Sequence, residues 1–390
     1  MASQTINGIL CHFTLVLFIF ISLAPNSSIA KKSKVFGLKM NVIDRCWRWN
    51  PEWRRNRPQL ATCSVGFTGK MTNNIGRDLV HYKVTDPSDN PLDPKPGTLR
   101  YGATMIKQKV WITFKKDMKI KLEKPLLISS FTAIDGRGSN VHIAGNACLM
   151  IFKATNIIIH GLRIHHCRSQ EPSSVMGPEQ QVIPFGQVDG DAIRLVTASK
   201  IWIDHNTLYE CQDGLLDVTR GSTDVTISNN WFREQDKVML LGHDDGFIRD
   251  KNMKVTVVYN HFGPNCNQRM PRIRHGYAHV ANNLYQGWMQ YAIGGSECPK
   301  VKSEANLFIA PKSGKKEVTW RKGNERNEGL WKFYSVRDSF ENGASFTQSE
   351  LGRLKPNYTS EQVFEVADAK SVRSLTRAAG ALKCTKSSRC

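Results

Sequence analysis

The segment Thr226-Ile227-Ser228-Asn229-Asn230 has four relatives in the middle of the chain, and each of them also ends in asparagine. The relatives are Trp202-Ile203-Asp204-His205-Asn206, Val257-Val258-Tyr259-Asn260, His279-Val280-Ala281-Asn282-Asn283 and Lys302-Ser303-Glu304-Ala305-Asn306. The steps between the final asparagines are 24, 30, 23 and 23 residues, and a large apolar residue follows two positions later: Leu208, Phe232, Phe262, Tyr285 and Phe308. A period of this length indicates a solenoid, in which every repeat forms one coil.

Short β-branched runs make each coil strand-like. Val225-Thr226-Ile227 and Val255-Thr256-Val257-Val258 are typical of strands, and strands of neighbouring coils stack about 4.8 Å apart. The leucine framework of leucine-rich repeats is missing, and propeller blades need a longer period. We therefore predict an all-β protein, a right-handed parallel β-helix over residues 99–312. The five asparagines should form an internal ladder, and the residues that follow them should stack in the same way.

The two flanks of the repeat lack the asparagine period. Residues 31–98 contain a stretch rich in Trp and Arg, and residues 313–390 are strongly basic. A solenoid has to cover its exposed ends, so we predict an N-terminal extension and cap in the first segment and a C-terminal cap and tail in the second. The unpatterned stretch 168–188 is predicted to be a long loop off one face.

The first thirty residues contain no charged side chain. The apolar run 13–21 is followed by Ser28-Ile29-Ala30, whose small residues suit a cleavage site, so residues 1–30 are predicted to be a signal peptide. A membrane anchor is the alternative, but the apolar run is short for one. We expect a secreted, extracellular protein that has no membrane segment after signal removal. Asn357-Tyr358-Thr359 is the N-glycosylation sequon of the mature chain.

Ten cysteines are present, and nine remain once Cys11 leaves with the signal peptide. The odd number predicts at least one thiol that is free or bonded to another chain. Cys46 with Cys63, and Cys384 with Cys390, are close enough in sequence to form local disulfide bonds. The five central cysteines are expected to be in part buried apolar residues.

The chain is strongly basic. Lys and Arg number 54 and Asp and Glu 34, which gives a formal charge of +20, and the 40% of hydrophobic residues argues against disorder. Such a charge favours a polyanionic partner, which can be nucleic acid, an anionic membrane surface or an acidic polysaccharide. No nucleic-acid-binding motif accompanies the charge, and the predicted secretion also disfavours nucleic acid.

Two acidic groups recur at the spacing of one coil. Asp189-Gly190-Asp191 is followed 24 residues later by Asp213-Gly214-Leu215-Leu216-Asp217. Either Asp-Gly pair alone is an ordinary turn signal. On adjacent coils the two groups can share one face, and carboxylates without Cys or His suit calcium better than zinc. We predict a metal site formed by Asp189, Asp191, Asp213 and Asp217, with Gly214 allowing the bend that brings the last two together.

A basic group follows two coils later. Arg272 and Arg274 share a face of an extended chain, and Arg269 joins them only if Pro271 bends it. Lys237 lies between the acidic and basic groups. In a chain this basic, a solvated surface explains such a run about as well as a functional site does.

Two further polar groups are interpreted as structural. Trp202, Asp204 and His205 are expected in the core or at a turn. Asp244-Asp245-Gly246 is expected to be a turn, and an acid pair for hydrolysis is the weaker alternative.

Motifs spread over nearly all of the mature chain resemble the plant pectate lyases, a calcium-dependent polysaccharide lyase family with a parallel β-helix fold. The residues that carry the resemblance are Asn41-Val42-Ile43-Asp44, Cys46-Trp47, Pro94-Lys95-Pro96-Gly97-Thr98-Leu99-Arg100, Ile134-Asp135-Gly136-Arg137-Gly138, Asp189-Gly190-Asp191-Ala192-Ile193, Trp202-Ile203-Asp204-His205-Asn206, Val238-Met239-Leu240-Leu241-Gly242-His243, Gln268-Arg269-Met270-Pro271-Arg272, Tyr291-Ala292-Ile293-Gly294-Gly295 and Ala379-Gly380-Ala381-Leu382. Cys298 departs from the family pattern, in which a small or polar residue is usual after Gly-Gly-Ser.

The resemblance implies a role for each matching residue. Asp189, Asp191, Asp213 and Asp217 match the calcium-binding carboxylates. Arg269 matches the arginine that removes a proton, and Lys237 and Arg274 match the cations that bind substrate. The implied reaction is β-elimination on de-esterified homogalacturonan (pectate), which leaves 4,5-unsaturated oligogalacturonides, in a monomeric enzyme of the cell wall that degrades pectin. Arginine is protonated at ordinary pH, so the role of Arg269 as a base rests on the resemblance alone.

Three other functions remain as alternatives. A polygalacturonase would hydrolyse the same polymer on the same fold, but its acid constellation is not found. A pectin lyase that acts on methyl-esterified polymer would not need the calcium carboxylates. A non-catalytic wall protein could bind pectate in a basic groove without cleaving it, although the presence of both acidic and basic groups argues against this.

Overall fold

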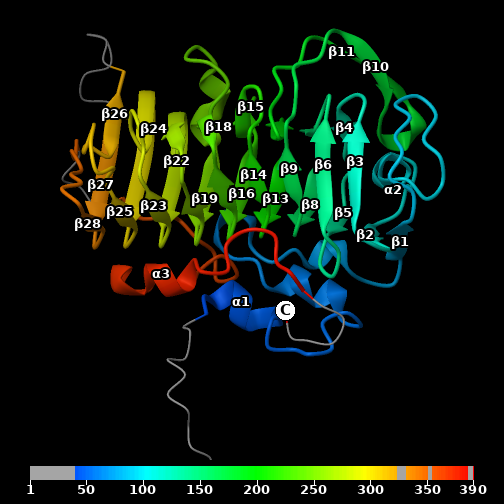
Figure 1. Cartoon of the computed structure of the whole chain (residues 1–390), viewed down its shortest axis with the longest axis horizontal. Coiled ribbons are helices and arrows are strands. Elements are labelled where there is room, and N and C mark those ends of the chain that lie inside the picture. The colour runs from blue at the N-terminus through cyan, green and yellow to red at the C-terminus, as the bar shows by residue number, and fades with distance from the viewer. Residues whose placement is uncertain (1–39, 323–330, 350–353, 385–389) are drawn as a thin grey trace, which may run out of the picture. The chain divides into compact units, whose positions relative to one another are not determined.

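The β-branched segments form strands that pair in parallel with the equivalent strands of the next coil (Figure 1). The computed structural model describes residues 40–322, 331–349, 354–384 and 390. Residues Lys39–Cys390 form one compact unit. The predicted signal peptide lies outside the described residues. No described helix has the length and apolar character that crossing a membrane requires.

Within the described residues, the larger sheet has 17 strands, which pair in parallel. They are β1 (Val80–Val84), β2 (Val110–Phe114), β4 (Leu126–Leu127), β5 (Thr132–Asp135), β7 (Leu149–Phe152), β8 (Thr155–His160), β12 (Ile193–Val196), β13 (Ser199–Asp204), β15 (Gly214–Thr219), β16 (Thr223–Ser228), β18 (Gln235–Leu241), β19 (Lys254–Val258), β21 (Cys266–Gln268), β22 (Arg272–Ala281), β24 (Ile293–Glu304), β26 (Thr319–Arg321) and β27 (Lys332–Val336).

The smaller parallel sheet has nine strands in the same part of the chain. They are β3 (Met118–Leu122), β6 (Val141–Gly145), β9 (Arg163–His165), β14 (Thr207–Tyr209), β17 (Trp231–Arg233), β20 (His261–Phe262), β23 (Leu284–Gln286), β25 (Leu307–Ile309) and β28 (Ser339–Glu341).

The larger sheet contains two rows of strands. The first row passes from β4 through β7, β12 and β15 to β18, and the second passes from β1 through β2, β5, β8, β13 and β16 to β19. The rows meet at β22, which pairs with both β18 and β19. A central coil such as β12–β13–β14 therefore places one strand in each row and one in the nine-stranded sheet. This is the predicted right-handed parallel β-helix.

The predicted asparagine ladder is present and fully buried. The Nδ2 of Asn206 donates to the Oδ1 of Asn230 at 3.1 Å, and the same bond links each asparagine to the next as far as Asn306. From Asn230 onward, each Oδ1 also accepts from the backbone N–H of the preceding ladder asparagine at 2.9 Å. The ladder ends on the Oδ1 of Asp338, which accepts the side-chain bond of Asn306 at 3.0 Å.

The predicted stack of apolar side chains lies beside this ladder. The ring centroids of Phe232 and Phe262 are 5.0 Å apart, those of Phe262 and Tyr285 4.8 Å, and those of Tyr285 and Phe308 4.5 Å. Phe340 extends the stack by one further coil, with its centroid 5.6 Å from that of Phe308. Burial of Phe232, Phe262, Tyr285 and Phe308 contributes to the apolar core of the middle coils.

The sheets extend beyond the predicted limits of 99–312 at both ends. β1 lies before residue 99 and pairs with β2, while β26, β27 and β28 lie after residue 312. The terminal coils were not predicted because their sequences lack the repeated asparagine. β1 has no ladder asparagine after it, and Asp338 takes the ladder position in the last coil.

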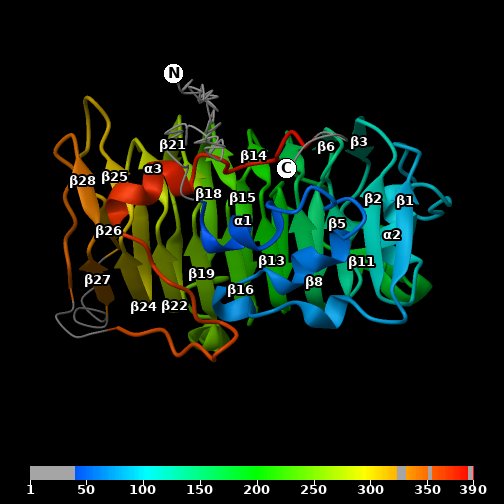
Figure 2. The ribbon, with the colours of Figure 1, turned by 90° about the horizontal axis from the view of Figure 1, so that it is seen from below.

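The terminal segments lie along the outside of the second row (Figure 2). The backbone N–H groups of Phe67 and Thr68 donate to the hydroxyls of Thr256 and Thr226 at 3.0 and 3.2 Å. From the other end of the chain, the hydroxyl of Tyr358 is 2.8 Å from that of Thr256. Much of the predicted N-terminal cap therefore covers a side of the β-helix.

The helices are short. They are α1 (Val42–Trp47), α2 (Leu99–Thr104), α3 (Val372–Leu375), η1 (Arg57–Thr62), η2 (Gly66–Thr68), η3 (Thr72–Asn74), η4 (Pro178–Gln180), η5 (Ile248–Asn252) and η6 (Ala369–Ser371). α2 buries Leu99 and Ala103 in the main core beside β1 and β2. α1 and α3 lie outside the strands on the side of the terminal segments (Figures 1 and 2).

The stretch 168–188 is more regular than a loop. It contains the antiparallel hairpin β10 (Ser173–Met176) and β11 (Val182–Phe185), which Figure 1 shows outside the parallel sheets. The hairpin buries Val175 against Leu127 and Met150 of the first row. Its strands lack a long alternating pattern, which explains why the sequence predicted only a loop.

Three disulfide bonds join the described cysteines. Cys46–Cys63 and Cys384–Cys390 are the predicted local pairs, and a third bond links Cys148 to Cys167. The expected free thiols are Cys211, Cys266 and Cys298, the first two of them buried. Burial raises the pKa of both Cys211 and Cys266 to about 12, so these two thiols are unreactive packing residues at neutral pH.

Candidate functional site

The first row of strands brings the four predicted aspartates together. Asp189 and Asp191 precede β12, Asp213 directly precedes β15, the next strand of the row, and Asp217 lies within β15. The register places Gly214 of β15 beside Lys237 of β18, so Lys237 lies on the coil that follows the acidic groups. The spacing of one coil therefore places the two acidic groups on adjacent strands of the row.

Gly214 is the point at which two of the carboxylates meet. Its backbone N–H donates to the Oδ1 of Asp191 at 2.8 Å. A Cβ atom at this position would lie 2.8 Å from the Oδ1 of Asp191 and 2.9 Å from the Oδ1 of Asp217. Glycine is needed here for the close approach of the carboxylates, rather than for the bend that the sequence suggested.

Burial makes the inner carboxylates hard to ionise. It raises the pKa of Asp191 to about 6, against the opposing effect of Arg194. Burial also raises the pKa of Asp217 well above its usual range, and the charge of Asp191 adds to this effect. The Oδ2 of Asp191 is buried and has no hydrogen-bond partner. Such a group is one that a cation of higher charge would stabilise.

Two cations contact the aspartates in the structure. The Nζ of Lys237 is 2.6 Å from the Oδ1 of Asp213. The Nη1 of Arg194 is 3.1 Å from the Oδ1 of Asp189 and 3.9 Å from the Oδ2 of Asp191. The sequence analysis included Lys237 but missed Arg194. Its position three residues after Asp191, in the strand that follows the first acidic pair, was the available signal.

The predicted arginines lie farther along the same face. Arg269 has a left-handed backbone, with φ of 63°, and its carbonyl accepts from the N–H of Met239 at 2.7 Å. Its Nε is buried without a hydrogen-bond partner, and its charge acts on Asp217 to favour the ionised carboxylate. Arg269 therefore lies within electrostatic reach of the acidic cluster.

Arg274 has a partner that the sequence did not predict. Its Nε donates to the Oδ1 of Asp245 at 3.1 Å, and its Nη1 donates to the carbonyl of Gly242 at 3.0 Å. Asp245 also contacts Lys322 and Ser296, at 3.2 and 3.0 Å. The turn prediction for 244–246 accounts for Asp244, which accepts from the N–H of Gly246, but Asp245 instead anchors the basic group.

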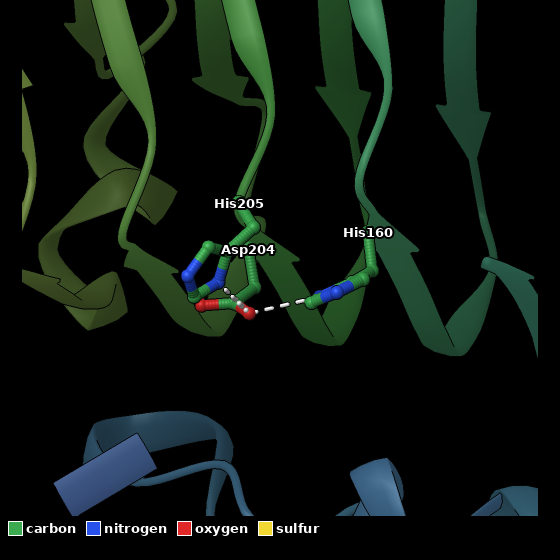
Figure 3. Close-up of side chains that lie close together, drawn as sticks. All are labelled: His160, Asp204 and His205. Atoms are coloured by element: carbon green, nitrogen blue, oxygen red, sulfur yellow. Dashed lines mark hydrogen bonds and ion pairs between the residues drawn. The ribbon is translucent and has the colours of Figure 1, made fainter. Parts of the chain in front are cut away.

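A second polar cluster lies where β8 and β13 of the second row end (Figure 3). His160, Asp204 and His205 are close enough for a metal to be considered, and all three are fully buried. The Oδ2 of Asp204 is 2.9 Å from the Nδ1 of His160 and 2.7 Å from the Nδ1 of His205, while its Oδ1 accepts from Ser228 and Asn229.

This buried cluster is better explained as a charge network than as a metal site. The Nε2 of His205 is 3.1 Å from the Oδ1 of Asp44 in α1. Burial opposes protonation of His205, but Asp204 and Asp44 outweigh it and raise its pKa to about 9. A protonated imidazole between two carboxylates has no lone pair for a metal. These contacts confirm the structural role predicted for Asp204 and His205.

One large cavity is separate from the acidic cluster. Its volume is about 730 Å³, and it lies beside the nine-stranded sheet, between residues such as Arg163, Tyr209 and Arg233 and the C-terminal segment 379–384. None of the predicted site residues lines it. The candidate site therefore lies on the first row, apart from this cavity.

The comparisons with known proteins agree on one family. The pectate lyase family model matches residues 115–383. Probable pectate lyase 16 from Arabidopsis thaliana is 48% identical over 90% of this chain and 88% of its own length. Pectate lyase 1 from Hesperocyparis arizonica is 48% identical over 87% of this chain and 93% of its own length.

The solved structures give the same result. The crystal structure of jun a 1, the major allergen from cedar pollen, has a TM-score of 0.84 and 47% identity, and covers 88% of this chain and 99% of that chain. A Bacillus subtilis pectate lyase variant has a TM-score of 0.58 at 16% identity, covers 82% of this chain and 97% of that chain, and shows the shared fold alone. The chain belongs to the pectate lyase family, and it is a polysaccharide lyase.

Proposed function

We propose that the protein cleaves pectate, the de-esterified form of homogalacturonan, by calcium-assisted β-elimination. The observation that carries this proposal is the acidic cluster on the first row, with the predicted cations beside it on the next coils. Pectate is a polyanion, and the net charge of +20 suits such a substrate. A buried carboxylate cluster without cysteine or histidine ligands suits calcium.

The residues present fit a calcium ion. Asp191 has a buried oxygen without a hydrogen-bond partner. Because Gly214 has no side chain, the Oδ1 atoms of Asp191 and Asp217 both lie close to the position that a Cβ atom would occupy there, at 2.8 and 2.9 Å. Asp189 and Asp213 complete the proposed set, and both are now held by cations, Arg194 and Lys237. When bound, calcium would supply positive charge that stabilises an ionised uronate carboxylate.

The side chains of the chain divide the remaining work. Lys237 and Arg274 bind uronate carboxylates of the substrate, exchanging their present partners Asp213 and Asp245 for them. Arg269, in its neutral guanidine form, takes the proton from carbon-5 and becomes a guanidinium. The C–H electron pair forms the 4,5 double bond, and the bond from carbon-4 to the glycosidic oxygen breaks with its electron pair on the oxygen, which takes a proton from water. Negative charge that builds on the uronate in the transition state lies among these cations, which is electrostatic stabilisation of the transition state.

One assay separates the proposed reaction from its alternatives. Elimination produces a conjugated double bond, so polygalacturonate treated with the enzyme and calcium should gain absorbance near the ultraviolet edge. Excess chelator should abolish this gain. New reducing ends without the absorbance would indicate a hydrolase, and binding without either product would indicate a pectate-binding wall protein.

Secretion and glycosylation belong to the same proposal. A cell-wall substrate requires export, which the predicted signal peptide would provide. Asn357 is exposed, so an oligosaccharide could be attached there without disturbing the packing. Release of the mature chain into the medium, with cleavage after Ala30, would test the predicted localisation.

A further inference from the structure

A guanidinium lies within the group of carboxylates that the proposed function assigns to calcium. Arg194 in β12 is the register partner of Asp217 in β15. Its Nη1 contacts Asp189 and Asp191 at 3.1 and 3.9 Å, and its side chain is only 17% exposed. These contacts are therefore screened less by water and salt than those of a surface ion pair.

Arg194 and a metal ion would compete for the same oxygens. An ion bound by Asp189 and Asp191 would need the carboxylate oxygens that now face the guanidinium, and its two positive charges would repel a guanidinium at this distance.

The side chain has space to leave. A cavity of about 250 Å³ beside the hairpin is lined by Arg194, Val196, Arg220 and residues 183–188. The cavity lining contains no acidic residue, so it offers the guanidinium room without a competing carboxylate.

We propose that Arg194 is an internal competitor of calcium. It neutralises Asp189 and Asp191 in the metal-free enzyme and lowers the affinity of the site for the ion. This inference rests on the proposed calcium site, and it adds a residue that controls the calcium affinity of that site. Calcium binding then depends on added negative charge, which the uronate carboxylates of the substrate bring.

The test is calcium binding to the purified protein without substrate, measured by titration calorimetry. Arg194→Thr should bind calcium at least about tenfold more tightly than wild type, because it removes the competing charge. Arg194→Lys keeps the charge, and its calcium affinity should stay near that of wild type.

Arg220→Thr is the matched control. It removes one positive charge from the same cavity, where Arg220 forms no ion pair with the four aspartates, and it should change calcium affinity little.

Each outcome decides between the two proposals. Equal or weaker calcium binding by a folded Arg194→Thr variant, next to measurable binding by wild type, would overturn the competitor role and leave the calcium site intact. Absence of binding in wild type and variant alike would overturn the competitor role, and the chelator assay on polygalacturonate would then decide separately whether calcium takes part in the reaction. Circular dichroism and the melting temperature establish that each variant is folded. Binding that appears only in Arg194→Thr would support the competitor role.

Discussion

Close contacts between charged groups restrict which residue types the site can contain. Gly214 shows this most directly, because its missing side chain is what lets Asp191 and Asp217 approach each other. Glycine in a strand is otherwise unfavourable. The sequence identified Gly214 as part of the acidic motif, but the distance of approach depends on the neighbouring coil and could not be read from the motif.

Gly214→Ala should separate these two carboxylates. The added methyl would meet oxygen atoms at 2.8 and 2.9 Å, so the carboxylates have to move. We expect the fold to lose about 1–3 kcal/mol of unfolding free energy, as overpacking does, together with a marked loss of calcium affinity. Denaturant unfolding and titration calorimetry measure the two effects.

Gly186→Ala is the control for this change. A Cβ atom at residue 186 has no neighbour within 4 Å, and the variant should match wild type in both measurements. Unchanged calcium affinity in Gly214→Ala would show that Asp191 and Asp217 do not bind one ion together.

Substitution of Arg269 is the most direct test of the proposed chemistry. Arg269→Lys keeps the positive charge but loses the planar guanidinium and its reach. Lys237 and Arg274 would still bind the uronate, so turnover should fall by about a hundredfold or more while KM changes little. The rate of release of unsaturated products measures this.

Arg274→Ala should behave differently from Arg269→Lys. It removes a proposed substrate contact and leaves Asp245 with Lys322 and Ser296, so both KM and turnover should suffer. If Arg269→Lys releases unsaturated products at the wild-type rate, then Arg269 is a substrate-binding cation and another residue is the base.

At the scale of elements, the asparagine ladder was predictable because one residue type repeats at one position of each coil. Its continuation was not, because the step from Asn306 to Asp338 is longer and the residue type changes. The contacts of Arg274 with Asp245 were missed for a related reason. They join residues 29 positions apart through the register of β18 and β22, which no local pattern contains.

Asn230→Leu should break the ladder in its middle. The Nδ2 of Asn230 donates to Asn260 and to the carbonyl of Ile203, and its Oδ1 accepts from the backbone and side chain of Asn206. Each buried group left without a partner costs about 1–3 kcal/mol, so the unfolding free energy should fall by several kcal/mol. Denaturant unfolding measures it, and the exposed Asn140→Leu should have a small effect. A midpoint unchanged in Asn230→Leu would contradict the ladder as a source of stability.

The docking of α1 should make stability depend on pH. His205 is faced by Asp44 of α1, which also pairs with Arg48, and by Asp204, which it shares with His160. Because the folded pKa of His205 is raised to about 9, its contribution is complete below the unfolded value near 6.5 and is lost as pH rises through about 9.

The unfolding free energy should therefore fall between pH 6.5 and 9, by on the order of 3 kcal/mol. His160 acts in the opposite direction at lower pH, because burial lowers its pKa and the unfolded chain then binds more protons below pH 6.5. Denaturant unfolding at several pH values measures the curve. His205→Asn should remove the decline above pH 6.5, and a decline that persists unchanged in this variant would assign it to other groups.

At the scale of the whole described unit, the terminal segments and the site occupy different sides of the β-helix. Residues 40–79 and 354–384 pack against the second row and the nine-stranded sheet, for example through Thr68 with Ile201 and Arg163 with Ala381. The hairpin β10–β11 packs on the first row at β4 and β7, and the strands farther along this row carry the acidic cluster and the cations. The sequence predicted the fold and grouped the site residues, but the covering of one side depends on contacts between segments more than a hundred residues apart.

The excess of positive charge should act on the substrate before any single contact forms. With 54 Lys and Arg against 34 Asp and Glu, the protein attracts a polyanion over distances that salt controls. The screening length falls from about 30 Å at 0.01 M salt to about 8 Å at 0.15 M. We therefore expect KM for polygalacturonate to rise severalfold over this range at constant free calcium, while kcat changes much less, because bound substrate is held by contacts inside the site.

An uncharged osmolyte at matched osmolality is the control and should leave KM unchanged. A KM that stays constant with salt would show that the net charge serves another purpose and that the contacts of Lys237, Arg274 and calcium alone determine affinity.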